Sequence, residues 1–308
     1  MTAVLSVLIP IFLLIATGAL ARRFVAKEEM HWIGLERLVY YILFPALLIE
    51  TLARADLTGV PIAGVGGALL MTVLIVAGLC LLMRPVLAAR LEIDGPAFTS
   101  LFQASIRFQT FITLALTAGL YERQGLALAS VAIVALIPVL NVLCVTVLAH
   151  YAAPKRPSVR TVVAEVVRNP LIWSCVAGIV LNLIALPIPA SVYAYADALG
   201  RSSLALGLLM VGAGLSVHGL LRPRPVTFVA CAFKLVLVPT FALALAHAFG
   251  VSGIGLAVVA CCAAAPTSSS AYVLARQMGG DAELLAEILT VQTVLAAATM
   301  PAIIAFVT

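Results

Sequence analysis

The chain alternates long apolar runs with short polar segments. Ten apolar runs predict ten membrane-spanning helices, because a crossing needs about 20 residues at a rise of about 1.5 Å each. The predicted spans cover residues 3–21, 35–53, 60–83, 97–121, 126–149, 168–186, 193–217, 226–249, 253–277 and 282–306. The longest polar connection, residues 151–167, separates five spans from five, so we expect two repeats of opposite orientation, over residues 1–150 and 168–308.

Polar residues interrupt the fourth and ninth runs halfway along. The ninth carries Pro266, Thr267, Ser268, Ser269, Ser270 and then Tyr272, and the fourth carries Gln103, Ser105, Arg107, Gln109, Thr110 and Thr113. Proline removes a backbone donor, and hydrocarbon cannot satisfy the groups that a break frees. A broken helix at mid-depth is where secondary transporters bind substrate, although a simple proline kink satisfied by its own hydroxyls is the alternative. Matching prolines in the fifth and tenth runs, Pro138 and Pro301, favour an inverted repeat.

Composition places the chain in a membrane. Hydrophobic residues make up 64% and charged residues 10% of the 308 positions, whereas about 25% charged is usual in soluble proteins. All six cysteines fall inside apolar runs without Cys-x-x-Cys spacing, so we expect neither disulfides nor a metal site, and no cofactor. His-Glu-x-x-His and Gly-x-Ser-x-Gly motifs are absent, so the sequence does not suggest an enzyme.

The distribution of basic residues predicts the orientation. Thirteen lysines and arginines lie in the odd-numbered loops and three, Arg54, Arg123 and Arg201, on the other side. Cytoplasmic loops are rich in Lys and Arg, so we expect an integral plasma (inner) membrane protein with both termini outside the cytoplasm. The net charge of +5 is then a topology signal, and no nucleic-acid partner is needed.

Charged and amide residues inside the spans are candidates for function. Arg107 lies about 15 Å deep, where a cation needs a partner: a substrate anion, or a carboxylate such as Glu287. Snorkelling of the side chain to the membrane surface is the alternative if the span boundaries differ. Lys234 either reaches a broken-helix carbonyl or forms a buried pair. Glu287 is the candidate proton carrier, and Asp281 is expected to cap the last span.

Other polar residues have structural interpretations. Asn141, Gln292 and Asn182 are expected to form hydrogen bonds between helices. Glu50 and Asp197 lie near outer span ends and are expected to be solvated.

Two segments resemble the auxin efflux carrier family of bacterial permeases and plant auxin exporters. They read SIRFQTFITLALTAGLYERQGLALASVAIVALIPVLNVLCV, in the fourth and fifth spans, and CAAAPTSSSAYVLARQMGGDAELLAEILTVQT, in the ninth and tenth. The resemblance implies ten helices in two inverted five-helix repeats, crossing broken helices 4 and 9, and an elevator movement of spans 3–5 and 8–10 against a scaffold of spans 1, 2, 6 and 7. Gln109 replaces the family's Asn and Phe111 its hydroxyaromatic residue, so the resemblance does not define the substrate.

The expected function is secondary transport of small organic anions, with a site formed by Arg107, Gln109, Thr110, Thr113, Pro266, Thr267, Ser268, Ser269, Ser270 and Tyr272. Asn141, Lys234, Glu287 and Gln292 are secondary polar candidates. A non-transporting receptor for the same ligands, a cation-coupled symporter of the bile-acid-transporter type and a channel are the alternatives. Proton or sodium coupling, the direction of transport and a homodimer stay open.

Overall fold

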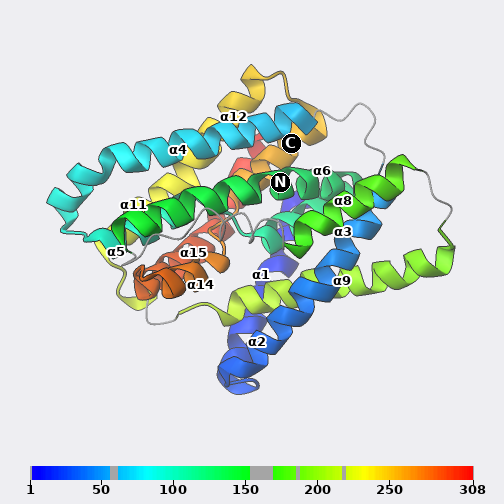
Figure 1. Ribbon diagram of the computed structural model, residues 1–308, viewed down its shortest axis with the longest axis horizontal. Coiled ribbons are helices and arrows are strands. Elements are labelled where there is room, and N and C mark those ends of the chain that lie inside the picture. Colours follow the sequence, from blue (N-terminus) through cyan, green and yellow to red (C-terminus); the bar gives the residue numbers. More distant parts are fainter. Residues whose placement is uncertain (1, 56–61, 153–168, 185–187, 217–219, 308) are drawn as a thin grey trace.

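A computed structural model describes residues 2–55, 62–152, 169–184, 188–216 and 220–307, and all regular structure in these ranges is helical (Figure 1). The predicted 151–167 linker and its basic residues fall almost wholly outside them. The first half of the chain contains α1 (Thr2–Phe24), α2 (Glu29–Leu38), the π-helix η1 (Val39–Leu43), α3 (Phe44–Ala53), α4 (Ile62–Leu91), α5 (Gly95–Ile106) and α6 (Thr110–Tyr151). The second contains α8 (Pro170–Leu183), α9 (Ala190–Ala213), α11 (Pro225–Ala232), the π-helix η2 (Phe233–Leu237), α12 (Val238–Ala248), α13 (Gly253–Ala264), α14 (Ser270–Met278) and α15 (Ala282–Val307).

Prolines account for both π-helices. Each lies directly before a helix with proline at its second residue, Pro45 in α3 and Pro239 in α12. Because proline lacks an N–H, the usual hydrogen bond is lost and the preceding turn widens. A different break divides α6, where Tyr121 and Glu122 have non-helical backbone angles. It separates the fourth predicted span from the fifth.

Within the residues that the structure describes, six helical stretches are long and apolar enough to cross a membrane: Thr2–Phe24, Glu29–Ala53, Ile62–Leu91, Gly95–Tyr151, Pro225–Ala248 and Ala282–Val307. Two apolar helices are shorter, Pro170–Leu183 and Gly253–Ala264. The prediction of a polytopic helical membrane protein is thereby confirmed, whereas the count of ten spans in two inverted repeats stays a prediction.

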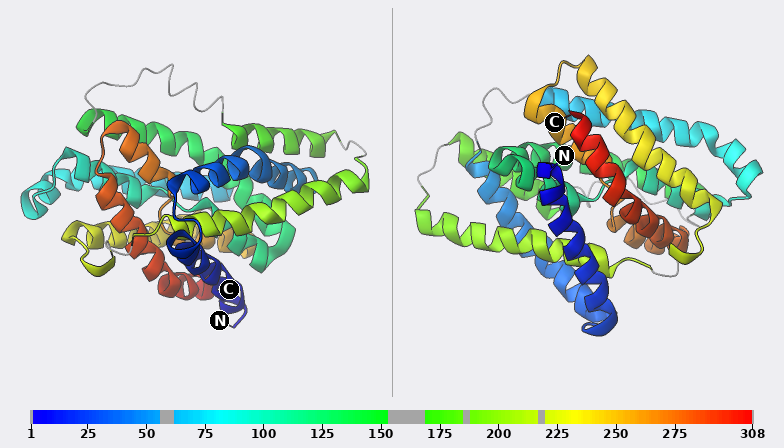
Figure 2. Two further views of the ribbon diagram at one scale, coloured as in Figure 1. Left: turned by 90° about the horizontal axis from the view of Figure 1, so that it is seen from below. Right: turned by 180° about the vertical axis from the view of Figure 1, so that it is seen from behind.

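The helices pack in two groups. The flanking group consists of α1, α2, η1, α3, α8 and α9, and the crossing group of α4, α5, α6 and α11 to α15 with η2. In the crossing group α4 and α12 run side by side, as Figures 1 and 2 both show. The N-terminal end of α1 and the C-terminal end of α15 lie close together (Figure 2).

Small residues bring α1 and α9 into close contact. A Cβ atom on Gly18 would lie 2.0 Å from the carbonyl oxygen of Leu209, and one on Gly212 would lie 1.8 Å from that of Ile15. Only glycine permits this approach of two backbones, which is how membrane helices gain packing energy where no hydrophobic effect drives association.

Candidate functional site

The two interrupted spans are broken and meet at their breaks. One break comprises Arg107, Phe108 and Gln109, between α5 and α6, and the other residues 265–269, between α13 and α14. Ala265 is extended (φ −62°, ψ 139°), as the residue before a proline should be. The amide N–H of Gln109 donates to the carbonyl oxygen of Pro266 at 2.8 Å, so the backbones of the two breaks cross in contact.

Arg107 holds the crossing together. Its guanidinium donates from Nη1 to Ser270 Oγ at 2.9 Å, from Nη2 to Asn141 Oδ1 at 2.7 Å and from Nε to Cys144 Sγ at 3.3 Å. All three acceptors are neutral, and within the described ranges no carboxylate lies within 4.0 Å of Arg107. The predicted alternative of a pair with Glu287 is therefore wrong, and the positive charge of Arg107 stays available to a bound anion.

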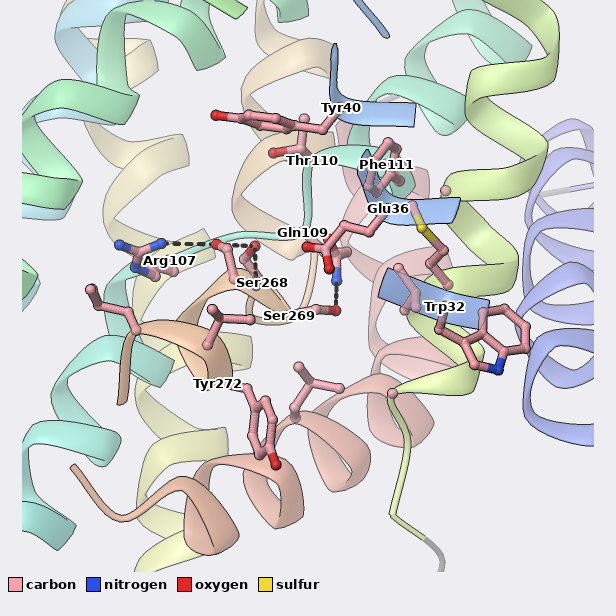
Figure 3. A pocket seen from close by; sticks show the side chains of 18 of the residues that line it. Trp32, Glu36, Tyr40, Arg107, Gln109, Thr110, Phe111, Ser268, Ser269 and Tyr272 are labelled. Atoms are coloured by element: carbon pink, nitrogen blue, oxygen red, sulfur yellow. Dashed lines mark hydrogen bonds between the residues drawn. The ribbon is translucent and has the colours of Figure 1, made fainter. Parts of the chain in front are cut away.

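Serines of the second break complete the crossing. Gln109 donates from Nε2 to Ser269 Oγ at 2.9 Å, and the hydroxyls of Ser268 and Ser270 lie 2.9 Å apart (Figure 3). Both α6 and α14 begin at the crossing, so the partial positive charge of two helix N-termini lies beside Arg107. This arrangement favours a negatively charged ligand.

Gln292 supports the crossing from the side of the protein core. Its Oε1 accepts from the amide of Thr267 at 3.0 Å, while Nε2 donates to the carbonyls of Ala230 at 3.1 Å and Ala104 at 3.3 Å. The side chain is fully buried and does not line the cavity. Gln292 thus positions the break and satisfies backbone groups that proline and helix ends leave free.

A cavity of about 1420 Å³ lies against the crossing. Its lining includes eight of the predicted residues, namely Arg107, Gln109, Thr110, Asn141, Ser268, Ser269, Ser270 and Tyr272. Thr113, Pro266 and Thr267 do not line it: the Thr113 hydroxyl donates to the Gln109 carbonyl, and Thr267 is buried. Arg22, Glu29 and Glu283 also line the cavity, and they belong to helix ends predicted to face the cytoplasm.

The remaining candidates lie away from the cavity. The Glu287 carboxylate accepts from the backbone of Arg224 at 2.6 Å, from Arg224 Nε at 3.0 Å and from the Thr227 hydroxyl. Lys234 is buried in η2, with Nζ 5.8 Å from the centre of the Phe108 ring. Asp281 caps α15 as predicted, accepting from the amide of Leu284 at 2.8 Å.

One prediction about the outer end is wrong. Glu50 is only 4% exposed and is paired with Arg54 and Arg123, each at 3.2 Å. The sequence pattern alone could not reveal the burial, because Arg123 comes from the distant α6 kink. Asn182 bridges helices as expected, donating to the carbonyls of Ala53 and Ala55.

The second predicted span supplies cavity residues that the sequence pattern missed. Trp32, Glu36 and Tyr40 line the cavity from α2 and η1 (Figure 3). They are spaced four residues apart, which places them on one helix face. Glu36 is the second residue of the predicted span 35–53 and was not among the predicted site residues. The four-residue spacing was the signal that could have found it.

Comparisons with known proteins find similarity to membrane transporters. Residues 153–304, the second half of the chain, match the family described as "Membrane transport protein". A protein of Rhizobium meliloti (strain 1021) described as "Putative malonate transporter" is 26% identical over 328 residues, covering 97% of this chain and 94% of that protein. Members of the family are permeases, so the chain is a membrane transporter and not an enzyme. These two matches support a permease of the auxin efflux carrier family.

Proposed function

We propose that the protein is a secondary carrier of small organic anions and that the crossing of the two breaks is its substrate site. The observation that carries the proposal is the guanidinium of Arg107, which lines the cavity and whose hydrogen-bond partners among the described residues are all neutral. A carboxylate bound beside it would gain charge-assisted hydrogen bonds from Arg107 and from the first-turn amides of α6, and the N-terminus of α14 would add positive potential. The Rhizobium relative is described as a "Putative malonate transporter", and malonate is a small organic anion with carboxylate groups.

Transport would proceed by an elevator movement of the crossing group against the flanking group. In this proposal the two groups correspond to the transport and scaffold parts, spans 3–5 and 8–10 against spans 1, 2, 6 and 7. Residues 1–150 and 168–308 would form the inverted repeats, and both termini would lie on the extracytoplasmic side of the inner membrane. The bound substrate would move together with the crossing group, because both breaks belong to that group.

The cavity geometry supports an inward-facing state. The cavity meets the helix ends expected in the cytoplasm, whereas Glu50 and Arg123 form an ion pair near the opposite ends of α3 and the first part of α6. That pair links the flanking group to the crossing group, and it would have to break when the crossing group moves. We expect the Glu50–Arg123 ion pair to stabilise the inward-facing state by holding the outer side closed.

Counterflow separates a carrier from a receptor. Purified protein in liposomes preloaded with unlabelled malonate should accumulate external labelled malonate transiently, and control liposomes without protein should not. A receptor would bind the label without accumulating it. Repeating the assay with and without a sodium gradient tests the symporter alternative, in which sodium would be required. Failure of every carboxylate tested to give counterflow would contradict the proposed function.

A further inference from the structure

Glu36 is the carboxylate that faces the candidate site from the flanking group. It lies about 10 Å along the helix from Glu29, the first residue of α2, and is exposed to the cavity. Its side chain and that of Gln109 point into the same space, with Trp32 and Tyr40 on either side along the helix (Figure 3). Glu36 therefore opposes the crossing across the substrate cavity.

Among the described residues, Glu36 has no ion pair, a property that it shares with Glu283 at the cavity mouth but not with Glu29, Glu50 or Glu287. Glu50 is paired with two arginines and Glu287 with Arg224, while Glu29 at the cavity rim is paired with Arg276 at 3.2 Å. Over the residues that the structure describes, no cation lies within 4.0 Å of the Glu36 carboxylate. An ionised Glu36 would thus repel any second negative charge on a bound substrate.

The other charged and titratable groups that line this cavity are Arg22 from α1, Glu29 and Arg37 from α2, Tyr40 and Tyr41 from η1, Arg107 from the first break, Tyr272 from α14 and Glu283 from α15. The residues that α9, packed against α2, contributes to the lining carry no titratable side chain. Of the cations, Arg107 is the one at the crossing, while Arg22 and Arg37 belong to the helix ends at the mouth. Among the residues that line the cavity, the crossing thus offers one positive charge, and Glu36 faces it from the other wall. Lys234 packs behind the crossing, with Nζ 5.8 Å from the centre of the Phe108 ring, and does not line the cavity.

We propose that Glu36 makes this carrier select a singly charged anion whose far end carries a neutral hydrogen-bond donor. The inference rests on the proposed function. The carboxylate of such a substrate would bind at Arg107, and the donor would reach Glu36. A dicarboxylate meets this requirement only after gaining one proton, which it then shares with Glu36 as a carboxyl-to-carboxylate hydrogen bond. The species bound, and hence transported, carries one negative charge.

This selection makes dicarboxylate binding depend on pH. As pH rises, the dicarboxylate loses its second proton and the ionised Glu36 repels the dianion, so its affinity falls. Protonation and anion binding favour one another, because each removes a charge that opposes the other. An anion with a permanently neutral donor, such as the half-amide malonamate, does not lose its donor and keeps most of its affinity.

The test compares malonate with malonamate as competitors of labelled malonate bound at pH 5.5 and pH 8. In the unaltered protein, malonate should weaken about tenfold or more between the two pH values, and malonamate should be the better competitor at pH 8. Glu36→Gln, which keeps the shape and removes the charge, should reduce the malonate change to about twofold or less. Glu28→Gln, an exposed residue just before α2 and outside the cavity lining, should behave like the unaltered protein.

Two results would overturn the inference: malonate and malonamate competing equally at both pH values in the unaltered protein, or an unchanged pH dependence in Glu36→Gln. The first needs no variant, so a folding defect cannot obscure it. Either result leaves counterflow intact and so leaves the proposed function standing. Absence of counterflow with any carboxylate would contradict the proposed function itself.

Discussion

The backbone amide of Gln109 and the carbonyl oxygen of Pro266 share a hydrogen bond of 2.8 Å, although 157 positions separate the residues in the chain. This bond joins the break of the first half to the break of the second. Both partners are backbone groups that a continuous helix would have used internally. Each break therefore satisfies part of the hydrogen-bonding need that the other creates.

The contribution of this bond can be isolated with two variants at one position. Gln109→Ala removes the side chain and keeps the N–H, whereas Gln109→Pro removes both, and φ of −81° at this position is compatible with proline. We expect the proline variant to be less stable than the alanine variant by about 1 to 3 kcal/mol, the cost of an unsatisfied buried carbonyl. Thermal unfolding in detergent measures the difference, and equal melting temperatures would show that the contact is dispensable.

Gln292 should be required for stability without touching substrate. Gln292→Leu removes the side-chain partner of the Thr267 amide and one donor to each of the Ala104 and Ala230 carbonyls in the core, so we expect a loss of about 2 to 4 kcal/mol of unfolding free energy. Gln124→Leu, at an exposed position, is the matched control. Gln292 does not line the cavity, so its loss should affect malonate binding by the folded protein only indirectly, through the position of the second break. A variant as stable as the unaltered protein would refute the supporting role.

The positions of the breaks followed from the sequence because polar residues inside an apolar run have few explanations. Pro266 and its hydroxyl neighbours, and the cluster around Arg107, identified both. Their partners did not follow. Nothing in the local pattern distinguishes Ser270 from Glu287 as the partner of Arg107, since that choice depends on how helices 163 and 180 residues away are rotated.

Burial at the outer end was also beyond the local pattern. Glu50 lies near the end of its span, where solvation is usual, and only the α6 kink brings Arg123 to it. Glu36 was missed for a different reason: it lies at the start of its predicted span, and the local pattern does not show that this end faces a cavity that reaches into the protein.

Glu287 should stabilise the fold and have no part in pH-dependent binding. Glu287→Gln removes the charge that Arg224 faces and weakens the acceptor of Thr227, so we expect the free energy of unfolding to fall by about 1 to 2 kcal/mol. The loss is this small because the Arg224 side chain is 41% exposed, and solvent screens the ion pair. Malonate affinity measured between pH 5.5 and pH 8 should change with pH as in the unaltered protein. A flattened pH dependence would instead make Glu287 the titrating group.

The Glu50–Arg123 pair should hold the outer side closed. Arg123→Ala leaves Glu50 with Arg54 alone, so we expect the outward-facing population to rise several-fold. A cysteine introduced at Thr110, which lines the cavity, then reports access from outside by its labelling rate with a membrane-impermeant maleimide, since the six native cysteines are buried.

Arg201→Ala is the control for that experiment, because it breaks an exposed ion pair with Asp197 within α9. It should leave the labelling rate unchanged. Equal labelling of the Arg123→Ala and Arg201→Ala proteins would mean that the buried pair does not restrain the outward movement.

The central claim is that the crossing binds the anion through Arg107, and the dissociation constant of labelled malonate tests it most directly. Arg107→Ala, measured beside Arg201→Ala, should weaken binding by about tenfold to a hundredfold, the value of a charge-assisted hydrogen bond, and Arg107→Lys should recover only part of the loss. Melting temperatures show whether each variant is folded. A folded Arg107→Ala protein that binds malonate within twofold of the unaltered protein would contradict the account.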